Sequence, residues 1–466
     1  MREGVPRSHS RRPRWWLVPF VAVAVMAASV TVAPSVAAVG GDLDPSFGVG
    51  GRVAILPFGS SRGGNGIAFQ ADGKIVVAGA VPVNPEWTRQ RFAVARFDVD
   101  GTLDPTFDDD GFASTIFQPG KKCHEDAKAV VVQSDGKIVA AGLTSCSWVE
   151  GGDGPWAFAL ARYNGDGTPD PTFGDNGAVI TNFGNPARHS AEAMAVALEP
   201  DGSIVAAGRA DGGFALARYE TDGTLDTSFS DNGRVKTDFT PQVDYLNDIA
   251  VQPDGKIVAG GTGAIFIVDT DKLSPRTVLA RYNLDGTLDE TFGRDGKVTT
   301  WFRGGRCEGA SESFGLAIQP DGRIVEGGTA VCAAAYHLRW ALARYLPNGR
   351  LDQTFGGDGR VVTIFRAKEG NDWMRGGVAI QAGGKIVAAG ATGSAGFHFT
   401  LARYRTGGRL DTTFGTDGRV RTRFGKRPRC ASGAWTGLAI QSDGRIVTIG
   451  GGGCLSSFVM ARFLPS

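Results

Sequence analysis

The segment IAVQPDGKIVAGG, residues 249–261, places an Asp-Gly pair between two short runs of small or aliphatic residues. The pair consists of Asp254 and Gly255. Glycine readily adopts the left-handed backbone conformation that tight hairpin turns need, and the apolar flanks suit two buried antiparallel strands. The segment therefore predicts a β-hairpin.

Six further versions of this hairpin occur along the chain, which makes seven in all. The others are GIAFQADGKIVVAG (66–79), VVVQSDGKIVAAG (130–142), AVALEPDGSIVAAG (195–208), LAIQPDGRIVEGG (316–328), VAIQAGGKIVAAG (378–390) and LAIQSDGRIVTIG (438–450). The first and last turn glycines, at 73 and 444, give a mean spacing of 371/6, or about 62 residues. Such a period indicates one repeat array, rather than the roughly three domains that the length alone would suggest.

Two further motifs recur with the hairpin, also in seven copies each. One is LDxTF or a close variant, and it begins at residues 43, 103, 169, 225, 288, 351 and 410. The other is ALARY or a close variant, at residues 93–97, 159–163, 215–219, 278–282, 341–345, 400–404 and 459–463. Together with a GRVxTxF strand, each unit holds four short strands joined by Asp-Gly and Gly-rich turns.

Seven units of four strands predict an all-β fold, a seven-bladed β-propeller of four-stranded blades that forms a single domain over residues 39–466. The array begins with the strand GRVAILPF (51–58) and ends with FVMARF (458–463). We therefore expect the N-terminal strand to complete the seventh blade and close the ring, which also covers the sheet edge that this blade would otherwise expose. A solenoid is the alternative. It is disfavoured because an open stack needs atypical capping repeats at its ends, whereas all seven units here share the same motifs.

One charge of each sign recurs in every unit. The seven ALARY arginines are Arg96, Arg162, Arg218, Arg281, Arg344, Arg403 and Arg462. The seven LDxTF aspartates are Asp44, Asp104, Asp170, Asp226, Asp289, Asp352 and Asp411. A single asymmetric ligand does not need seven copies of a group, so these residues predict an ion pair that braces each blade.

The motifs PDPTFG (169–174), QPDGKIVAG (252–260) and FALARY (158–163), at a period near sixty residues, resemble the delta-60 repeat family of bacterial proteins. The resemblance covers the whole chain after residue 38 and implies a secreted, propeller-like protein. The family carries no assigned reaction and no catalytic residues. Departures from its pattern are minor: Pro169 replaces a Leu, Gly383 replaces the hairpin Asp, and Gly407 replaces the Asp of an Asp-Gly turn.

Five arginines within the first 14 residues precede an uncharged run from Trp15 to Ala38. This pattern predicts a secretory signal peptide over residues 1–38. The run is long enough to span a bilayer, so an uncleaved N-terminal anchor is the alternative. Arg14 stands where a twin-arginine signal has an apolar residue, which favours the general secretory route. We expect a secreted protein with no membrane association beyond this segment.

Removal of residues 1–38 takes away five Arg and one Glu, a net +4, so the formal charge changes from +1 to about −3. A chain with this charge lacks the basic excess that is typical of nucleic-acid-binding proteins. We expect a monomer with no nucleic-acid partner.

The six cysteines fall into three pairs that flank the second, fifth and seventh hairpins. They are Cys123 with Cys146, Cys307 with Cys332, and Cys430 with Cys454, separated by 23, 25 and 24 residues. Each pair stands at the open end of an antiparallel hairpin, where the two strands are close enough for a disulfide. Three disulfides agree with export to an oxidising compartment. Free thiols or a metal site are the alternatives.

The turns PDG and DGTLDxTFG hardly vary between units, whereas the connections before and after each hairpin vary in length and composition. Function usually lies on variable loops that a rigid scaffold carries. All six cysteines and most of the histidines and tryptophans fall in or beside these variable connections, which share one face of a propeller. We therefore expect the binding surface on that face.

Counted from the hairpin Gln position, Asp126, Glu192 and Glu312 each stand seven residues earlier, with His124 and His189 nearby. This places them close to the expected mouth of the central channel. They predict a ligand site for a divalent cation or a polar molecule, although exposed loops also collect polar residues without one. No other cofactor is expected.

Two tryptophans, Trp373 and Trp435, are the remaining candidates for ligand contact on this face. Glu326 is a second anomaly, because the other copies of its strand have Val, Ala or Thr there. We expect it to pair with an arginine or to line the channel. The segment DVDGTLD (98–104) resembles part of a calcium loop but lacks the terminal Glu of an EF-hand, so we expect its acids to cap turns.

These features favour a secreted binding or scaffold module, rather than an enzyme, that engages a glycan or a protein at the cell surface through its variable face. The alternative is a metal-assisted hydrolase or lyase with its site at the channel mouth, which requires the His and acidic candidates to converge. A structural surface protein without a small ligand is the second alternative.

Overall fold

The computed structural model describes residues 39–465 except 56–63, 84–88, 120–121, 148–154, 185–189, 241–242, 268–271, 305–306, 333–336, 366–370, 394–397, 425–432 and 453–456. The predicted signal peptide, His189, Cys430 and Cys454 lie outside the described residues.

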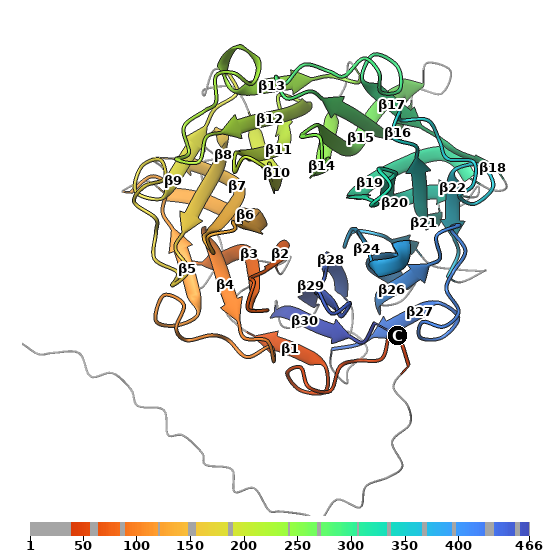
Figure 1. Cartoon of the computed structure of the whole chain (residues 1–466), viewed down its shortest axis with the longest axis horizontal. Coiled ribbons are helices and arrows are strands. Elements are labelled where there is room, and N and C mark those ends of the chain that lie inside the picture. Colours follow the sequence, from red (N-terminus) through yellow and green to blue (C-terminus); the bar gives the residue numbers. More distant parts are fainter. Residues whose placement is uncertain are drawn as a thin grey trace, which may run out of the picture. The chain divides into compact units, whose positions relative to one another are not determined.

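Seven antiparallel sheets follow one another around a ring (Figure 1). The innermost strands are β2 (Gly66–Phe69), β6 (Lys122–Val132), β10 (Ala191–Leu198), β14 (Asp244–Val251), β19 (Cys307–Ile318), β24 (Val378–Ile380) and β28 (Gly433–Ile440). The second strands are β3 (Ile75–Pro82), β7 (Ile138–Ser147), β11 (Ile204–Ala210), β15 (Ile257–Ile267), β20 (Ile324–Cys332), β25 (Ile386–Gly393) and β29 (Ile446–Gly452).

The third strands are β4 (Gln90–Phe97), β8 (Trp156–Tyr163), β12 (Gly213–Tyr219), β16 (Lys272–Tyr282), β21 (His337–Tyr345), β26 (His398–Tyr404) and β30 (Ser457–Phe463). The outer strands are β5 (Phe112–Thr115), β9 (Ala178–Thr181), β13 (Arg234–Thr237), β17 (Lys297–Thr300), β22 (Arg360–Thr363), β27 (Arg419–Thr422) and β1 (Arg52–Ile55). We number the blades 1 to 7 in this order, so that blade 1 begins with β2.

The predicted seven-bladed propeller is confirmed, and so is its closure. β1 pairs antiparallel with β30, with Arg52 opposite Ala461, so the first described strand is the outer strand of blade 7. Two blades deviate slightly. In blade 5, β18 (Phe302–Gly304) adds to β19, and in blade 6 the inner strand is split into β23 (Asn371–Trp373) and β24. Two 3-10 turns, η1 (Ser230–Asn232) and η2 (Ala382–Gly384), complete the elements.

The core lies between the blades rather than within one layer. Each of the seven apolar clusters combines side chains of two neighbouring sheets, such as Val139 of blade 2 with Ile204 of blade 3. All seven residues of β12 are buried, because this sheet is covered on both faces. Burial on both faces explains why the strand motifs read as continuous apolar runs instead of alternating ones.

The seven ALARY arginines have the structural role predicted for them. Each forms an ion pair with the LDxTF aspartate of its own unit at 2.6–2.9 Å. Each guanidinium also lies over the Phe of that motif, 4.5–4.8 Å from the ring centroid. A second nitrogen donates to a backbone carbonyl of the next blade, and Arg462 of blade 7 donates to Val99 of blade 1 at 2.5 Å. The arginines therefore link the blades around the whole ring.

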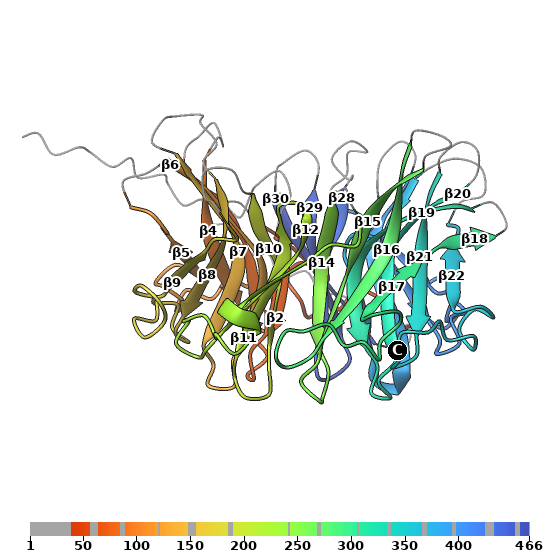
Figure 2. The same ribbon diagram turned by 90° about the horizontal axis from the view of Figure 1, so that it is seen from above.

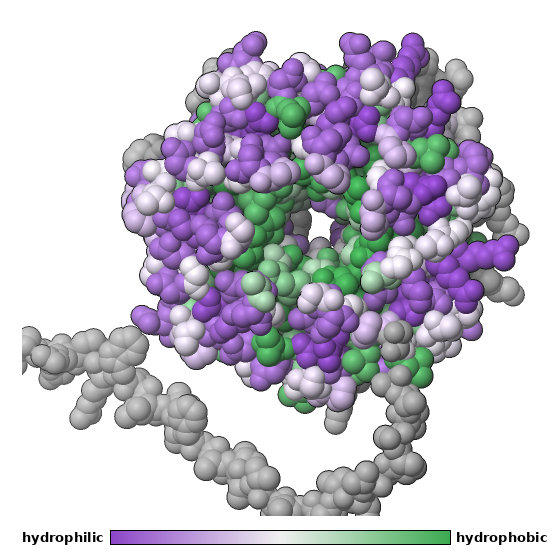
Figure 3. All heavy atoms as spheres, viewed as in Figure 1, coloured by the Kyte–Doolittle hydropathy of each residue, from purple (hydrophilic) through white to green (hydrophobic). Residues whose placement is uncertain are grey.

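Because the strands alternate in direction, the two classes of connection lie on opposite sides of the ring (Figure 2). We call the side with the PDG and DGTLDxTFG turns the turn face, and the opposite side the loop face. Asp100 of DVDGTLD accepts hydrogen bonds from the backbone and hydroxyl of Thr102, so this acid caps a turn as predicted. Next to the turn face, each inner strand ends in a half-buried apolar residue, and apolar side chains surround the central opening (Figure 3).

Candidate binding site on the loop face

The inner strands share a β-bulge that positions their side chains toward the loop face. The register shifts between Ala193 and Ala195 in blade 3 and between Ser313 and Gly315 in blade 5, with equivalent shifts in blades 2, 4 and 7. Just before the bulge, the backbone carbonyl of one inner-strand residue lies against a glycine of the second strand. A Cβ built at Gly328 would lie 1.9 Å from the Glu312 oxygen. A bulge re-aims the adjacent side chain, so this glycine is needed to place the residue whose carbonyl lies against it.

Five residues occupy this same position in blades 2 to 6, because the carbonyl of each lies 1.9–2.1 Å from the Cβ built on its blade's equivalent glycine. We call them the rim residues: Asp126, Glu192, Tyr245, Glu312 and Trp373. Four of them are predicted candidates. Trp373 joins the set because blade 6 has one extra residue between the rim and Gln381. Tyr245 also stands seven residues before its hairpin Gln. It was missed because only carboxylates and histidines were considered at this position.

Two of the three rim carboxylates are paired with cations. Asp126 is only 5% exposed, accepts a hydrogen bond from Asn65 Nδ2 at 2.8 Å and forms an ion pair with Lys128. Glu192 forms an ion pair with Arg209 Nε at 2.7 Å. The charges of both carboxylates are therefore balanced by neighbouring side chains.

The rim residues of blades 4 and 5 are more exposed than the others. Tyr245 is 41% exposed, Glu312 is exposed and Trp373 is half-buried. The Arg209 guanidinium lies 5.0 Å from the Tyr245 ring centroid, and that of Arg375 lies 5.1 Å from a Trp373 ring centroid. Cation–π contacts of this kind restrain the aromatic side chains.

Arg375 also joins two blades, because its guanidinium lies 5.5 Å from the ring centroid of Phe314 in β19. The backbone amide of Met374, which follows Trp373, donates to the hydroxyl of Thr329 at 3.2 Å. Thr329 is the cross-strand partner of Glu312. Glu312 and Trp373 therefore stand at the same level of two adjoining inner strands.

Two other candidates lie elsewhere. His124 is half-buried in β6 opposite Ser145, two residues before Asp126. Trp435 is fully buried between blades 6 and 7, with a ring centroid 4.5 Å from that of Phe399. In this structure Trp435 is a core side chain that no ligand on the surface can contact.

Among the described residues, one group of three Cys, His, Asp or Glu ligand atoms is close enough to hold a metal ion. It consists of Cys123, Glu125 and Cys146, and both sulfurs belong to a disulfide. The group therefore indicates no metal. Glu125 anchors the preceding connection instead, since it accepts a hydrogen bond from the Phe117 amide at 3.1 Å. Burial raises the pKa of Glu125 to about 7.

Two of the three predicted disulfides are confirmed. Cys123 is bonded to Cys146 and Cys307 to Cys332, and each pair stands directly opposite in its ladder. The pairing of Cys430 with Cys454 stays a prediction, because both lie outside the described residues. Disulfides are typical of extracellular or periplasmic proteins. None of the described residues belongs to a helix long and apolar enough to cross a membrane.

Glu326 neither pairs with an arginine nor lines the channel, so both expectations for it are wrong. It is 2% exposed, and its Oε2 accepts a hydrogen bond from Tyr345 at 3.3 Å. It lies against blade 4, because its Oε1 would be 3.1 Å from a Cβ at Gly260. Burial raises the pKa of Glu326 to about 8. A carboxyl group kept neutral by burial needs no cationic partner.

A second acid, the half-buried Asp248, lies at the same interface and was missed by the sequence interpretation. Its Oδ2 accepts a hydrogen bond from the amide of Leu316 in blade 5 at 2.8 Å. Leu316 is the cross-strand partner of Glu326, and Gly260 is that of Asp248. Burial raises the pKa of Asp248 to about 7. The signal was available, because other units have Gly or Ala at this position.

Comparison with protein families supports the repeat interpretation. Residues 70–107, 133–173, 199–229, 252–292, 319–355 and 381–414 match the model of the family described as "Domain of unknown function (DUF5122) beta-propeller". These segments run from the hairpin turn to the LDxTF motif. A search of curated proteins finds no match.

Solved structures similar to this chain include two lyases and a secretion-system component. Virginiamycin B lyase from Staphylococcus aureus is 10% identical, with 88% of this chain and 98% of that chain covered and a TM-score of 0.45. A PL25 ulvan lyase bound to -[GlcA(1-4)Rha3S]- is 10% identical, with coverages of 89% and 96% and a TM-score of 0.48. PorZ of the Porphyromonas gingivalis type-IX secretion system is 10% identical, with coverages of 85% and 46% and a TM-score of 0.39.

None of these similarities is close enough to carry a function to this chain. The sheet order and the six matched segments agree on one point. The chain is a β-propeller repeat protein, with six of its seven units matching the DUF5122 beta-propeller family.

Proposed function

We propose that this protein is an exported binding module that holds a carbohydrate on its loop face, across the inner strands of blades 4, 5 and 6. The observation that carries the proposal is the row of Tyr245, Glu312 and Trp373, which occupy one repeat position in three consecutive blades and are accessible there. The charged side chains of the repeated motifs in these blades, by contrast, are engaged in contacts within and between blades.

The chemistry of this row suits sugar rings. Tyr and Trp offer an apolar face beside a polar group, which allows them to pack on the C–H face of a pyranose while its hydroxyls stay hydrogen-bonded. The Glu312 carboxylate is an acceptor for such hydroxyls, and the Arg209 and Arg375 guanidinium groups are donors. Arg209 and Arg375 also restrain the two rings, which reduces the entropy lost on binding.

The metal-assisted hydrolase or lyase has less support. It requires the acidic and histidine candidates to converge, but Asp126 and Glu192 are each paired with a cation of their own or a neighbouring strand. None of the described candidates belongs to a group of metal-ligand atoms.

The test is binding of the exported, oxidised protein to a glycan array, followed by titration with the best oligosaccharide. We expect Trp373→Ala and Tyr245→Ala each to weaken binding at least tenfold, because each removes a stacking surface, and Glu312→Gln to weaken it less. Leu284→Ala is the control, since Leu284 is 56% exposed on the turn face. Unchanged affinity in the Trp373 and Tyr245 double variant would contradict the proposal. Binding of a protein through the same residues, instead of a carbohydrate, would assign the site to that protein.

A further inference from the structure

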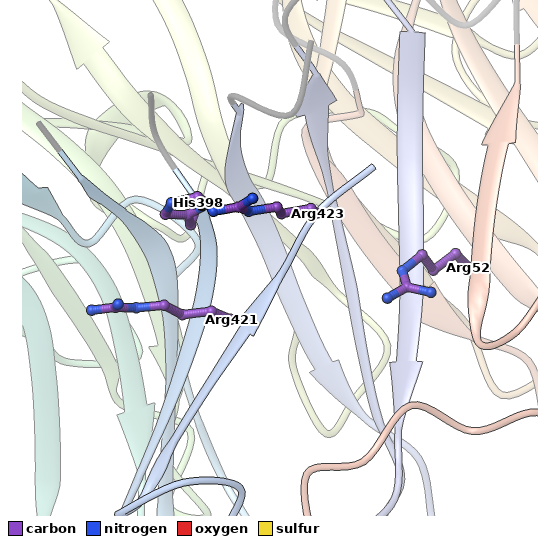
Figure 4. A pocket seen from close by; sticks show the side chains of 4 residues that line it. All are labelled: Arg52, His398, Arg421 and Arg423. Atoms are coloured by element: carbon purple, nitrogen blue, oxygen red, sulfur yellow. Dashed lines mark hydrogen bonds between the residues drawn. The ribbon is translucent and has the colours of Figure 1, made fainter. Parts of the chain in front are cut away.

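A separate pocket of about 290 Å³ is lined by Arg52, His398, Arg421 and Arg423. Arg52 begins β1 in blade 7, whereas the other three belong to β26, to β27 and to the position just after β27 in blade 6. Figure 4 shows Arg423 beside His398, with Arg52 extending toward them from β1 of the next blade. The pocket thus lies between blades 6 and 7, at the third and outer strands of blade 6 and the outer strand of blade 7.

Arg52 departs from a contact pattern that four other blades keep. There the first residue of the outer strand is basic and donates to a backbone carbonyl of the preceding blade: Arg234 to Asn182, Lys297 to Asp238, Arg360 to Trp301 and Arg419 to Ile364. Arg52 stands at the equivalent position but donates to Gly50 of its own turn, at 3.3 Å. Its Nε is buried without a hydrogen-bond partner, and burial lowers the pKa of Arg52.

The pocket is cationic on both sides. Its described lining residues include three arginines and no carboxylate. Arg423 Nε lies 3.2 Å from His398 Nδ1, and Arg423 Nη2 lies 3.3 Å from His398 Nε2, so the imidazole orients this guanidinium.

The surrounding sequence of blade 6 adds to this charge. The described segment RVRTRF (419–424) has three basic residues and no acidic one. The equivalent segment of blade 3, RVKTDF (234–239), has two basic residues and one acidic one. The positive charge is therefore local to this pocket and is not a property of the repeat.

We propose that this pocket binds a sulfate or carboxylate group carried by an acidic polysaccharide. Planar guanidinium groups match such oxyanions with paired hydrogen bonds, which a partly desolvated arginine such as Arg52 strengthens. The volume suits one anionic group with part of its sugar ring. Nucleic acid is less favoured, because its binding proteins present basic tracks over many phosphates and a basic net charge, whereas the formal charge of residues 39–466 is about −3.

The experiment is a titration of the full exported protein, at constant ionic strength, with dextran sulfate, polygalacturonate, neutral dextran and a single-stranded DNA oligonucleotide. We expect at least one of the two acidic polysaccharides to bind and neutral dextran not to bind, and the one that binds more tightly identifies the preferred anion. Arg421→Gln and Arg52→Gln should each weaken binding about tenfold. Arg421 is exposed, so its replacement leaves the fold intact, and a thermal melt checks Arg52→Gln.

Arg294→Gln is the charge-matched control, because Arg294 is 96% exposed and lies in a turn-face connection. An equal loss in this variant would mean that net charge alone is responsible, and would overturn the proposal. Absence of binding to both acidic polymers would also overturn it, and tighter binding of DNA through Arg52 and Arg421 would assign the pocket to nucleic acid instead. The site does not depend on the rim: Trp373→Ala should leave dextran sulfate binding unchanged, so either proposal can fail alone.

Discussion

At the scale of single residues, the carboxylates divide into two groups with opposite pKa shifts. Burial disfavours the charged form of Asp104, but hydrogen bonds from Lys74, Thr106 and Arg96 outweigh it and hold the pKa of Asp104 well below its usual range. Burial dominates for Asp248 and Glu326, whose pKa values rise to about 7 and about 8. The first group stabilises the fold in its ionised form and the second in its neutral form.

The raised pKa values of the second group predict that the free energy of unfolding decreases toward alkaline pH. An acid whose pKa is raised in the folded state contributes stability below its unfolded pKa and loses it as pH rises to the folded one. For Glu326 that window runs from about 4.5 to about 8. Glu326→Gln should therefore be more stable than the parent at pH 9, by a few kcal/mol, and the gain should shrink toward pH 5, as urea unfolding at pH 5, 7 and 9 will measure.

Glu220→Gln is the matched control, because Glu220 is exposed in a turn. A Glu326→Gln variant with the same pH slope as the parent would show that this acid is ionised in the folded state. The aspartates of the first group act at the other end of the range, where stability is lost as pH falls below about 4.

At the scale of elements, the bulged inner strand is what relates the scaffold to the candidate site. The backbone carbonyl of the rim residue lies against the last glycine of the hairpin motif. This close contact determines where the rim side chain points. That glycine is thus part of the site's support, although it recurs in the scaffold motif and carries no chemistry.

Replacement of this glycine should disturb both stability and the rim. In Gly328→Ala the new Cβ would meet the Glu312 carbonyl, so the inner strand must move. We expect a loss of about 2 kcal/mol or more in the free energy of unfolding, with weaker ligand binding. Gly407→Ala is the control, because nothing lies within 4 Å of its Cβ position. Equal melting temperatures for the two variants would show that the crossing is not tight in solution.

At the scale of the whole molecule, β1 holds the two ends of the chain together. Asp44, in the LDPSF turn ahead of β1, pairs with Arg462 of β30 at 2.8 Å, and Phe47 and Val53 join the core between blades 7 and 1. The same Arg462 reaches Val99 of blade 1. Closure therefore rests on a sheet edge, an ion pair and apolar packing at one place.

Removal of residues 39–55 from the exported protein should weaken the closure of the ring between blades 7 and 1. The edge of β30 would be exposed, and unpaired edges associate with other chains. We expect the full exported protein to elute as a monomer in size-exclusion chromatography, and the truncated one as oligomers or aggregates with a lower melting temperature. A truncated protein that stays monomeric and melts at the parent temperature would mean that the ring closes without β1.

The repeat made most of the fold predictable, including the number of blades, the closing strand, the arginine braces and two disulfides. The candidate site was predictable only in part. The count from the hairpin Gln finds Asp126, Glu192 and Glu312, but it fails for Trp373, because an inserted residue shifts the register in blade 6. The sequence interpretation also placed Trp435 on the binding face, because it lies beside a variable connection, whereas neighbouring blades bury it completely.

The sequence by itself determined the blade architecture, because hairpin turns, apolar strands and a fixed period are local properties repeated seven times. Only the tertiary structure decided which departures from the repeat meet. Burial at a blade interface, not a charged partner, determines the state of Glu326. The closing of the ring brings Arg52 beside His398 from the far end of the chain. Contacts between distant units depend on packing, and a local pattern carries no information about them.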